Sequence, residues 1–156
     1  MASGMYNNAK YEVLTGSMRL GSDTLKAVLV GAGYTFDADH VFIDEGTSGD
    51  IQSNELSATN YSGGFNGSGR KTLTPTAQAN NTSDRGEMAF ADLTWSSLGA
   101  PSGEGPVAGV AIVKEITNDA ASKLVAYYDI TDRNINGGDF TIDFLALGSG
   151  GNLRLT

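Results

Sequence analysis

Near its end the chain carries a short segment in which large apolar and polar residues alternate without exception. The apolar members are Phe140, Ile142 and Phe144, and the polar members are Thr141 and Asp143. Because successive side chains of a β-strand point to opposite faces, this alternation predicts a strand with one face on a core and the other in water. Burying the three apolar side chains contributes at most roughly 5–9 kcal/mol, at about 1.5–3 kcal/mol each. The segment therefore requires a second apolar layer to pack against.

Two apolar runs precede this segment and are its candidate neighbours. They span residues 107–113 and 124–130, a polar bend separates them, and an Asn136-Gly137-Gly138 turn follows the second run. Short apolar runs bounded by turn residues are typical of buried strands. Residues 105–155 therefore predict a β-meander, which closes with a tight turn at 148–151 and a short strand at 153–156.

The composition extends the β prediction to the whole chain. Its 156 residues include 21 glycines, which favours many short strands joined by tight turns. A chain of this length is most simply one domain and buries about two thirds of the surface that its unfolded form exposes. No cysteine is present, so disulfides and thiolate metal sites are excluded. We expect an all-β, single-domain antiparallel β-sandwich of jelly-roll type over residues 1–156.

The N-terminal segment differs from the rest because its apolar side chains recur at helical spacing. Tyr6, Ala9, Val13 and Leu14 follow this spacing, and Gly16 stands where a helix would stop. So short a helix is not stable alone. Residues 1–15 are therefore predicted either as a short helix over 7–15 or as a flexible arm.

Further strands are predicted at residues 23–30, 71–78 and 88–95. The first has apolar side chains on both faces, which is typical of a central strand covered on both sides. In the third, the alternation changes phase at Ala91-Asp92, which allows a bulge. Residues 37–45 have a short apolar centre and are predicted to fold under the sheet as a short helix or strand.

Residues 46–69 are rich in Gly, Ser, Thr and Asn and show no long periodic segment. We expect an extended loop with edge-strand pieces, anchored by the scattered apolar residues Ile51, Leu56, Tyr61 and Phe65. A structureless loop of more than about 15 residues is unusual unless it binds something. This loop is therefore predicted as a contact surface.

The charge balance excludes some classes of partner. The net charge is −8 and the pI is near 4.4, whereas nucleic-acid binding requires clusters of Lys and Arg. No segment approaches the roughly 20 apolar residues of a membrane-spanning helix, and residues 1–10 lack the basic and apolar regions of a secretory signal. We expect a soluble protein that binds neither nucleic acid nor membranes.

A search for catalytic chemistry finds little. His40 is the only histidine, so a multi-histidine metal site is excluded, and a turn or core role is the default. Residues 64–72 approach a phosphate-binding loop, but arginine occupies the lysine position and no helical pattern follows. The acidic residues at 37–45 lack the EF-hand pattern. We therefore predict no catalytic residue, no metal and no cofactor, and a protein that is not an enzyme.

Two sugar-directed alternatives stay open. Paired carboxylates for glycoside hydrolysis occur on β-sandwiches, although nothing in the spacing singles out a pair here. Tyr127, Tyr128 and Trp95 could form a sugar-binding platform, but such residues are more often core. Because Tyr127 and Tyr128 are adjacent on a predicted strand, one ring should be buried and the other exposed or at an interface.

Several of these segments, in this order, resemble a group of small structural proteins of tailed bacteriophages. The resemblance covers residues 14–156, and some members of the group resemble capsid decoration, or cement, proteins. Gly46–Gly69 is longer than in relatives, and Phe144 stands where they often have tryptophan. The segments that carry the resemblance are 23–30, Tyr34-Thr35, 39–42, 61–64, 90–96, 124–130, a Gly-Gly turn, 140–142 and 153–155.

The resemblance implies a non-enzymatic virion protein on the outer surface of the capsid, bound to the major capsid protein lattice and often trimeric. A tail or baseplate component is the main alternative, and a carbohydrate-binding module is the second. Contacts are expected from the N-terminal arm, from the 46–69 loop and from one exposed tyrosine. The candidate interface residues are Met5, Tyr6, Tyr11, Ile51, Leu56, Tyr61, Phe65 and Tyr128.

Overall fold

The computed structural model describes residues 3–145, 147 and 153–155, and within them the fold is all-β with antiparallel sheets. This confirms the predicted fold class. The elements, in chain order, are β1 (Gly4–Met5), α1 (Asn7–Leu14), β2 (Leu25–Gly31), α2 (Ile51–Asn54), β3 (Lys71–Thr72), β4 (Pro75–Asn80), β5 (Arg85–Phe90), β6 (Leu93–Leu98), β7 (Glu104–Lys114), β8 (Lys123–Ile135), β9 (Gly138–Ile142) and β10 (Leu153–Leu155).

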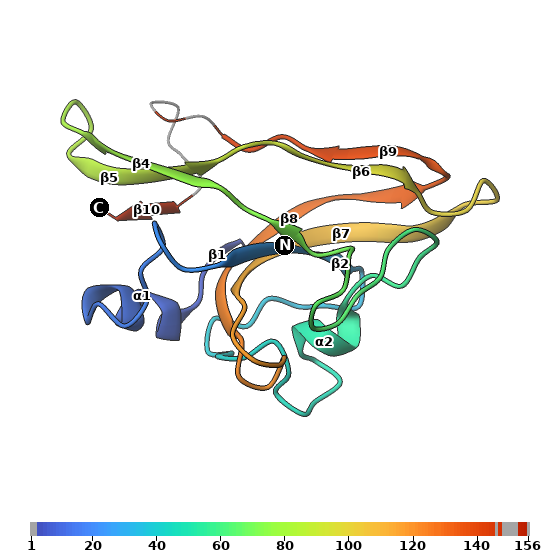
Figure 1. The fold of residues 1–156 in the computed structure, drawn as a ribbon, viewed down its shortest axis with the longest axis horizontal. Helices are drawn as coiled ribbons and strands as arrows, with labels where there is room; N and C mark the ends of the chain where they lie inside the picture. The colour runs from blue at the N-terminus through green and yellow to red at the C-terminus, as the bar shows by residue number, and fades with distance from the viewer. Residues whose placement is uncertain (1–2, 146, 148–152, 156) are drawn as a thin grey trace.

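The strands form one large sheet and two small ones. The large sheet has the order β1-β8-β7-β2-β3, and the small sheets have the orders β10-β5-β4 and β6-β9. Figure 1 shows the two small sheets end to end in one layer over the large sheet, with both helices and their connecting loops on the other side of the large sheet. The arrangement is sandwich-like, and the large sheet is its central layer.

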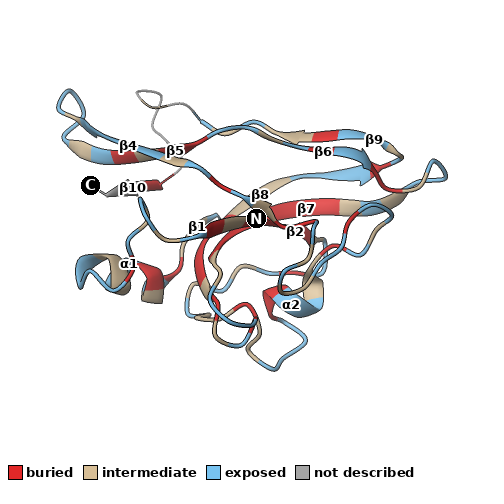
Figure 2. Cartoon of the chain, in the orientation of Figure 1, coloured by how far each residue is buried: buried red, intermediate tan, exposed pale blue. Residues whose placement is uncertain are grey.

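β2 is the covered central strand that its two apolar faces predict. It pairs with β7 on one side and with β3 on the other. Leu25 and residues 27–30 are fully buried, since the small sheets cover one face of the large sheet and the loops cover the other. Figure 2 shows the resulting concentration of buried residues in β2, β7 and β8.

The predicted meander is confirmed for β7 and β8 but not for β9. β7 and β8 form a long antiparallel hairpin, in which Val110 lies opposite Tyr128. β9 does not continue this sheet; it pairs with β6, with Phe140 opposite Trp95. Gly137 adopts φ +85° and donates its N–H to the Leu98 carbonyl at 2.8 Å, which directs the chain into the other layer. The meander prediction is wrong at this point.

Two predicted strands also divide between sheets. Residues 71–78 do not form one strand, because β3 belongs to the large sheet and β4 to a small one. The break follows Leu73, whose N–H donates to the Leu25 carbonyl at 2.9 Å. At Ala91-Asp92 the chain leaves β5 and enters β6 in a different sheet. The change of phase in the sequence therefore marks a change of sheet rather than a bulge.

The N-terminal segment forms a helix. α1 covers residues 7–14, its buried residue is Ala9, and Gly16 beyond its end has φ +75°. The helix docks at the edge of the large sheet, where the N–H of Tyr6 donates to the Val125 carbonyl at 3.1 Å. This contact supplies the tertiary support that a helix of eight residues needs.

Residues 37–45 form neither a helix nor a strand, contrary to prediction. Ile43 is fully buried, but the regular structure is limited to one bridge, between Phe42 and Lys123. The reason is local: the Glu45 carboxylate accepts the backbone N–H of Phe42 at 2.7 Å, which replaces ladder hydrogen bonds with side-chain ones. The final strand is confirmed as β10, paired with β5, and the tight turn predicted at 148–151 lies outside the described residues.

Candidate functional site

The loop at residues 46–70 is compact rather than extended. It contains α2, which begins after Asp50; the Asp50 carboxylate caps the helix by accepting the Ser53 N–H at 2.7 Å. Burial raises the pKa of this carboxyl, but backbone hydrogen bonds from Ser53, Thr47 and Glu45 outweigh it and hold the pKa below its usual value. Local hydrogen bonds thus give the Gly/Ser-rich loop a defined conformation.

Arg70, at the end of this loop, has a fully buried side chain that is hydrogen-bonded to two carboxylates, and its Nη1 lies 3.7 Å from a third, that of Glu115. Its guanidinium donates to Glu55 from Nε at 3.0 Å and from Nη2 at 2.6 Å. It donates to Asp119 from Nη1 at 2.6 Å and from Nη2 at 3.0 Å. The exposed fraction of the Arg70 side chain is 0%, and that of each carboxylate side chain is 5%. We call Arg70, Glu55 and Asp119 the buried clasp.

Polar groups around the clasp complete its hydrogen bonds. Tyr61 Oη donates to Glu55 at 3.0 Å and accepts the Leu29 N–H at 3.1 Å, and Gln52 donates to Asp119 at 3.2 Å. Burial alone would lower the pKa of Arg70, but the hydrogen bonds to its two carboxylates outweigh it and raise that pKa above its ordinary value. Arg70 is thus held as a cation within the chain.

The clasp ties three distant segments together. Glu55 follows α2, Arg70 precedes β3, and Asp119 lies in the turn between β7 and β8. Bidentate arginine–carboxylate pairs fix geometry as well as charge. The 46–70 loop is therefore held against the end of the large sheet in one conformation. Sequence reasoning noticed Arg70 only as a misplaced residue in a phosphate-loop pattern. In the structure that pattern ends in strand β3 and is followed by strand β4, not by a helix.

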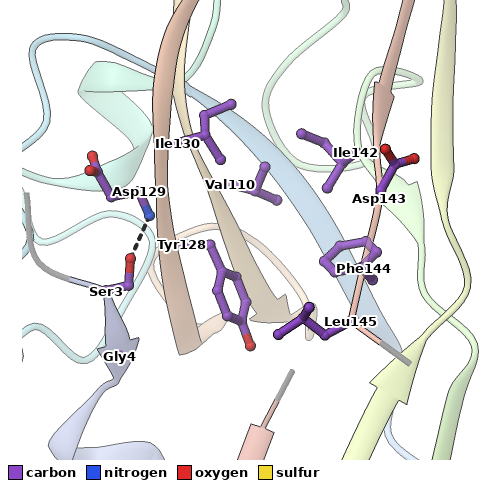
Figure 3. Close-up of a pocket in the computed structure, with 10 residues that line it drawn as sticks. All are labelled: Ser3, Gly4, Val110, Tyr128, Asp129, Ile130, Ile142, Asp143, Phe144 and Leu145. Atoms are coloured by element: carbon purple, nitrogen blue, oxygen red, sulfur yellow. Dashed lines mark hydrogen bonds between the residues drawn. The ribbon is translucent and has the colours of Figure 1, made fainter. Parts of the chain in front are cut away.

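A second feature is an apolar cleft between the two layers (Figure 3). Val110, Tyr128 and Ile130 form one wall, and Ile142, Phe144 and Leu145 form the other, with side chains directed into the space between. Its volume is about 450 Å³, which is in the range of natural ligand sites. We call these six side chains and their rim the apolar cleft.

The rim of the apolar cleft is polar. Gly4 of β1 and the preceding Ser3 border it, and the Ser3 hydroxyl accepts the Asp129 N–H at 2.8 Å. Asp129 and Asp143 are the charged residues among those that line it, and the Asp129 carboxylate turns to the far side of β8 (Figure 3). The Asp143 carboxylate also points away from the space between the walls (Figure 3), so the surface that faces the cleft is apolar.

Half of the predicted interface residues serve the core instead. Tyr6 and Ile51 are 0% exposed, Leu56 is 6% exposed and Tyr61 is 7% exposed. Apolar anchors in a polar loop are the residues that a compact loop buries, so the same pattern fits a contact surface and a folded loop equally well. These four positions are corrected to core positions.

The other four predicted positions are accessible to different degrees. Met5 and Phe65 are half-buried, and Tyr128 is half-buried in the wall of the apolar cleft. Tyr11 is 64% exposed on α1, and Leu14, three residues later on the same face, is 81% exposed. Sequence reasoning counted Leu14 in the helical apolar pattern and in the N-terminal arm expected to make contacts, but it did not name Leu14 among the interface residues.

The aromatic residues proposed as a sugar platform do not share a surface. Tyr127 is buried and packs edge-on against Tyr34 with ring centroids 4.9 Å apart, and burial raises its pKa to about 12. Trp95 is buried and donates Nε1–H to the Gly69 carbonyl at 2.6 Å. Tyr128 lies on the opposite face of β8 from Tyr127. The expectation that the two tyrosines separate, with one buried, is confirmed.

His40 lies away from both the clasp and the cleft. Its Nε2 is 3.8 Å from Asp37 Oδ2, and its ring centroid is 6.4 Å from that of Tyr34. Within residues 3–145, 147 and 153–155, no group of three or more Asp, Glu or His side chains could hold a metal ion. None of the described helices is long and apolar enough to cross a bilayer.

Comparison with known proteins adds no relative to this picture. No family model, no curated protein and no solved structure matches the chain.

Proposed function

We propose that this chain is a non-enzymatic structural protein of a bacteriophage virion, and that it decorates the outside of the head. Its partner is the lattice of the major capsid protein, and its role is to stabilise the shell. The proposal rests on the ordered set of segments that resembles such proteins and on an all-β, sandwich-like body of the kind that the resemblance implies.

The observation that carries the proposal is the buried clasp. Docking on a lattice is favoured when the contact loop is already ordered, because little conformational entropy is then lost on binding. The clasp holds the 46–70 loop through a guanidinium that is 0% exposed, while polar residues of the same loop, such as Ser62 and Asn66, stay exposed. The loop is thus a preformed surface rather than a flexible one.

Repetition on a shell compensates for a modest single contact. Many identical weak contacts on a symmetric lattice add through multivalency, so no deep polar pocket is needed. The net charge of −8 favours solubility before assembly. A decoration protein therefore requires surface shape and rigidity, and the buried clasp contributes to both by holding the 46–70 loop.

The test is the location and copy number of the protein in purified particles. Quantitative mass spectrometry of separated heads and tails should find it in heads, at a copy number comparable with that of the major capsid protein. Particles that lack it should release DNA at lower temperature or after milder osmotic shock. A few copies per particle, or recovery with tails alone, overturns the proposal and favours the tail or baseplate alternative. Recovery from neither fraction, together with binding on a glycan array, favours the carbohydrate-binding alternative.

A further inference from the structure

β4 forms a free edge of the three-stranded sheet β10-β5-β4. Among the described strands it pairs with β5 alone, and the register runs from Pro75–Phe90 to Asn80–Arg85 without a shift. In an antiparallel ladder, alternate N–H and C=O groups of an edge strand point away from its partner. Within the described residues, no backbone group of a third segment bonds to residues 76–79, and all four residues are exposed. The outer edge of β4 therefore has unused hydrogen-bonding groups.

This edge lacks the features that usually prevent a strand from pairing with another chain. Natural edge strands are commonly protected by charged side chains, by internal proline or by bulges. Residues 72–83 contain no charged side chain, although the net charge of the chain is −8. Their proline, Pro75, is the first residue of the strand, and the pairing with β5 has no bulge. The edge is therefore open to a further strand, which is the contact called β-augmentation.

Other free edges of the described strands are short, bulged or charged. In β6, Ser97 adopts φ +52° where the register shifts, and its carbonyl accepts Asn60 Nδ2 at 2.8 Å. β9 carries the exposed Asp139, and the outer half of β8 carries the exposed Asp132 and Arg133. β1 and β3 have two residues each, and β10 has three. If two copies of the chain meet edge to edge, β4 is therefore the strand that matches itself.

Two copies of β4 fit each other in one antiparallel register. A two-fold axis normal to the sheet brings residues on one face opposite residues on the same face. With the axis at Gln78, Thr76 lies opposite Asn80 of the other copy, and Ala77 lies opposite Ala79. The proline at the start of β4, which has no N–H to donate, falls outside these pairs. No charge meets a charge in this register, although both copies are negative overall.

We propose that two copies of this chain pair β4 with β4, which joins their three-stranded sheets into one continuous sheet across a dimer. The contact is isologous and closes at two copies. Main-chain hydrogen bonds supply the attraction, and the uncharged edge keeps like charges out of the contact. The inference goes beyond the proposed role on the head and does not rest on it.

Substitutions at Ala77 and Ala79 test both the contact and its register. Within the chain these residues lie opposite Met88 and Gly86, so a new charge there has no charged residue opposite it on β5. Light scattering after size exclusion should give twice 16.2 kDa for the wild type. Ala77→Lys together with Ala79→Lys places lysine opposite lysine twice and should raise the dissociation constant of the dimer roughly tenfold. The lysines reduce the overall negative charge, so this loss would come from local repulsion.

Opposite charges should restore the dimer. In Ala77→Lys with Ala79→Glu, each lysine lies opposite a glutamate of the other copy, so the mass should return to two chains. The control, Ala32→Lys with Ala120→Lys, adds the same charge at exposed positions outside the three-stranded sheet and should leave the mass unchanged. A monomeric wild type overturns the inference, and so does association that survives the two lysines or is not restored by the lysine–glutamate variant. Circular dichroism shows that each variant is folded. The measurement is made without capsids, so its outcome is independent of the head-binding test.

Discussion

The buried clasp and the apolar cleft differ in how the surroundings of their side chains match the polarity of those side chains. In the clasp, charged groups that favour water are buried, and each is matched by a partner at 2.6 to 3.0 Å. In the cleft, apolar groups that favour burial remain partly in water. The difference teaches that the clasp joins distant segments of the chain through matched charges, whereas the walls of the cleft leave apolar surface open.

The largest expected effect comes from breaking the clasp. Arg70→Met leaves Glu55 and Asp119 buried without their cation, and removing one partner of a buried ion pair costs about 3–5 kcal/mol. Urea unfolding should show this loss in the free energy of unfolding. The exposed Arg19 is the matched control, because Arg19→Met should change stability by less than about 0.5 kcal/mol. Equal effects of the two substitutions would mean that the clasp does not hold the loop.

A triple substitution sharpens this prediction. Replacing Glu55 and Asp119 by leucine in the Arg70→Met variant removes the unpaired charges, and apolar replacements of buried ion clusters are often neutral or stabilising. The triple variant should therefore recover part of the lost stability. If it is less stable than Arg70→Met alone, the carboxylates contribute through contacts other than those to Arg70.

Alanine substitutions compare the closed core with the open cleft. Leu29, fully buried in β2, should lose about 2–5 kcal/mol on substitution by alanine. Ile142→Ala in the wall of the cleft should cost clearly less in the monomeric protein, since its side chain is already partly in water. Urea unfolding at low protein concentration measures both changes. An equal cost would show that the cleft is packed closed in solution.

A smaller effect is expected at the start of α2. Asp50→Ala removes the helix cap and should cost about 0.5–2 kcal/mol. Asn also caps helices well, so Asp50→Asn isolates the contribution of the charge. Because the folded pKa of Asp50 lies below its usual value, the charged form stabilises the fold above the unfolded pKa of about 3.9.

The stabilising contribution of this charge is lost as the pH falls through the folded pKa. The difference in unfolding free energy between wild type and Asp50→Asn should therefore be constant near neutral pH and shrink in acid. Unfolding curves recorded at a series of pH values measure it. A difference that grows in acid would contradict the assigned hydrogen bonds.

The smallest effect concerns added volume. Phe144→Trp enlarges a ring that borders open space in the cleft, so stability should change by less than about 1 kcal/mol. Ala27→Leu enlarges a fully buried residue of β2, and overpacking of a closed core typically costs about 1–3 kcal/mol. Thermal unfolding of the two variants compares them directly. A large loss for Phe144→Trp would show that the cleft has no spare volume.

The sequence by itself determined the class of fold and most of the strands, and it left α1 open between a short helix and a flexible arm. Alternation predicts the exposed and buried faces of residues 140–144, and apolar residues on both faces predict the covered position of β2, because both patterns depend on local geometry alone. It did not determine which strands pair. β9 joins β6 through a turn at Gly137, and residues near in the chain belong to different layers.

Only the tertiary structure decided the roles of the long loop and of its charges. Ile51, Leu56 and Tyr61 look the same in sequence whether they face a partner or the core of their own chain. Arg70 and Asp119 are 49 residues apart, and no local pattern links them. Apolar spacing reports that a side chain will be buried, whereas its partner depends on contacts between distant segments, which form only when the layers assemble.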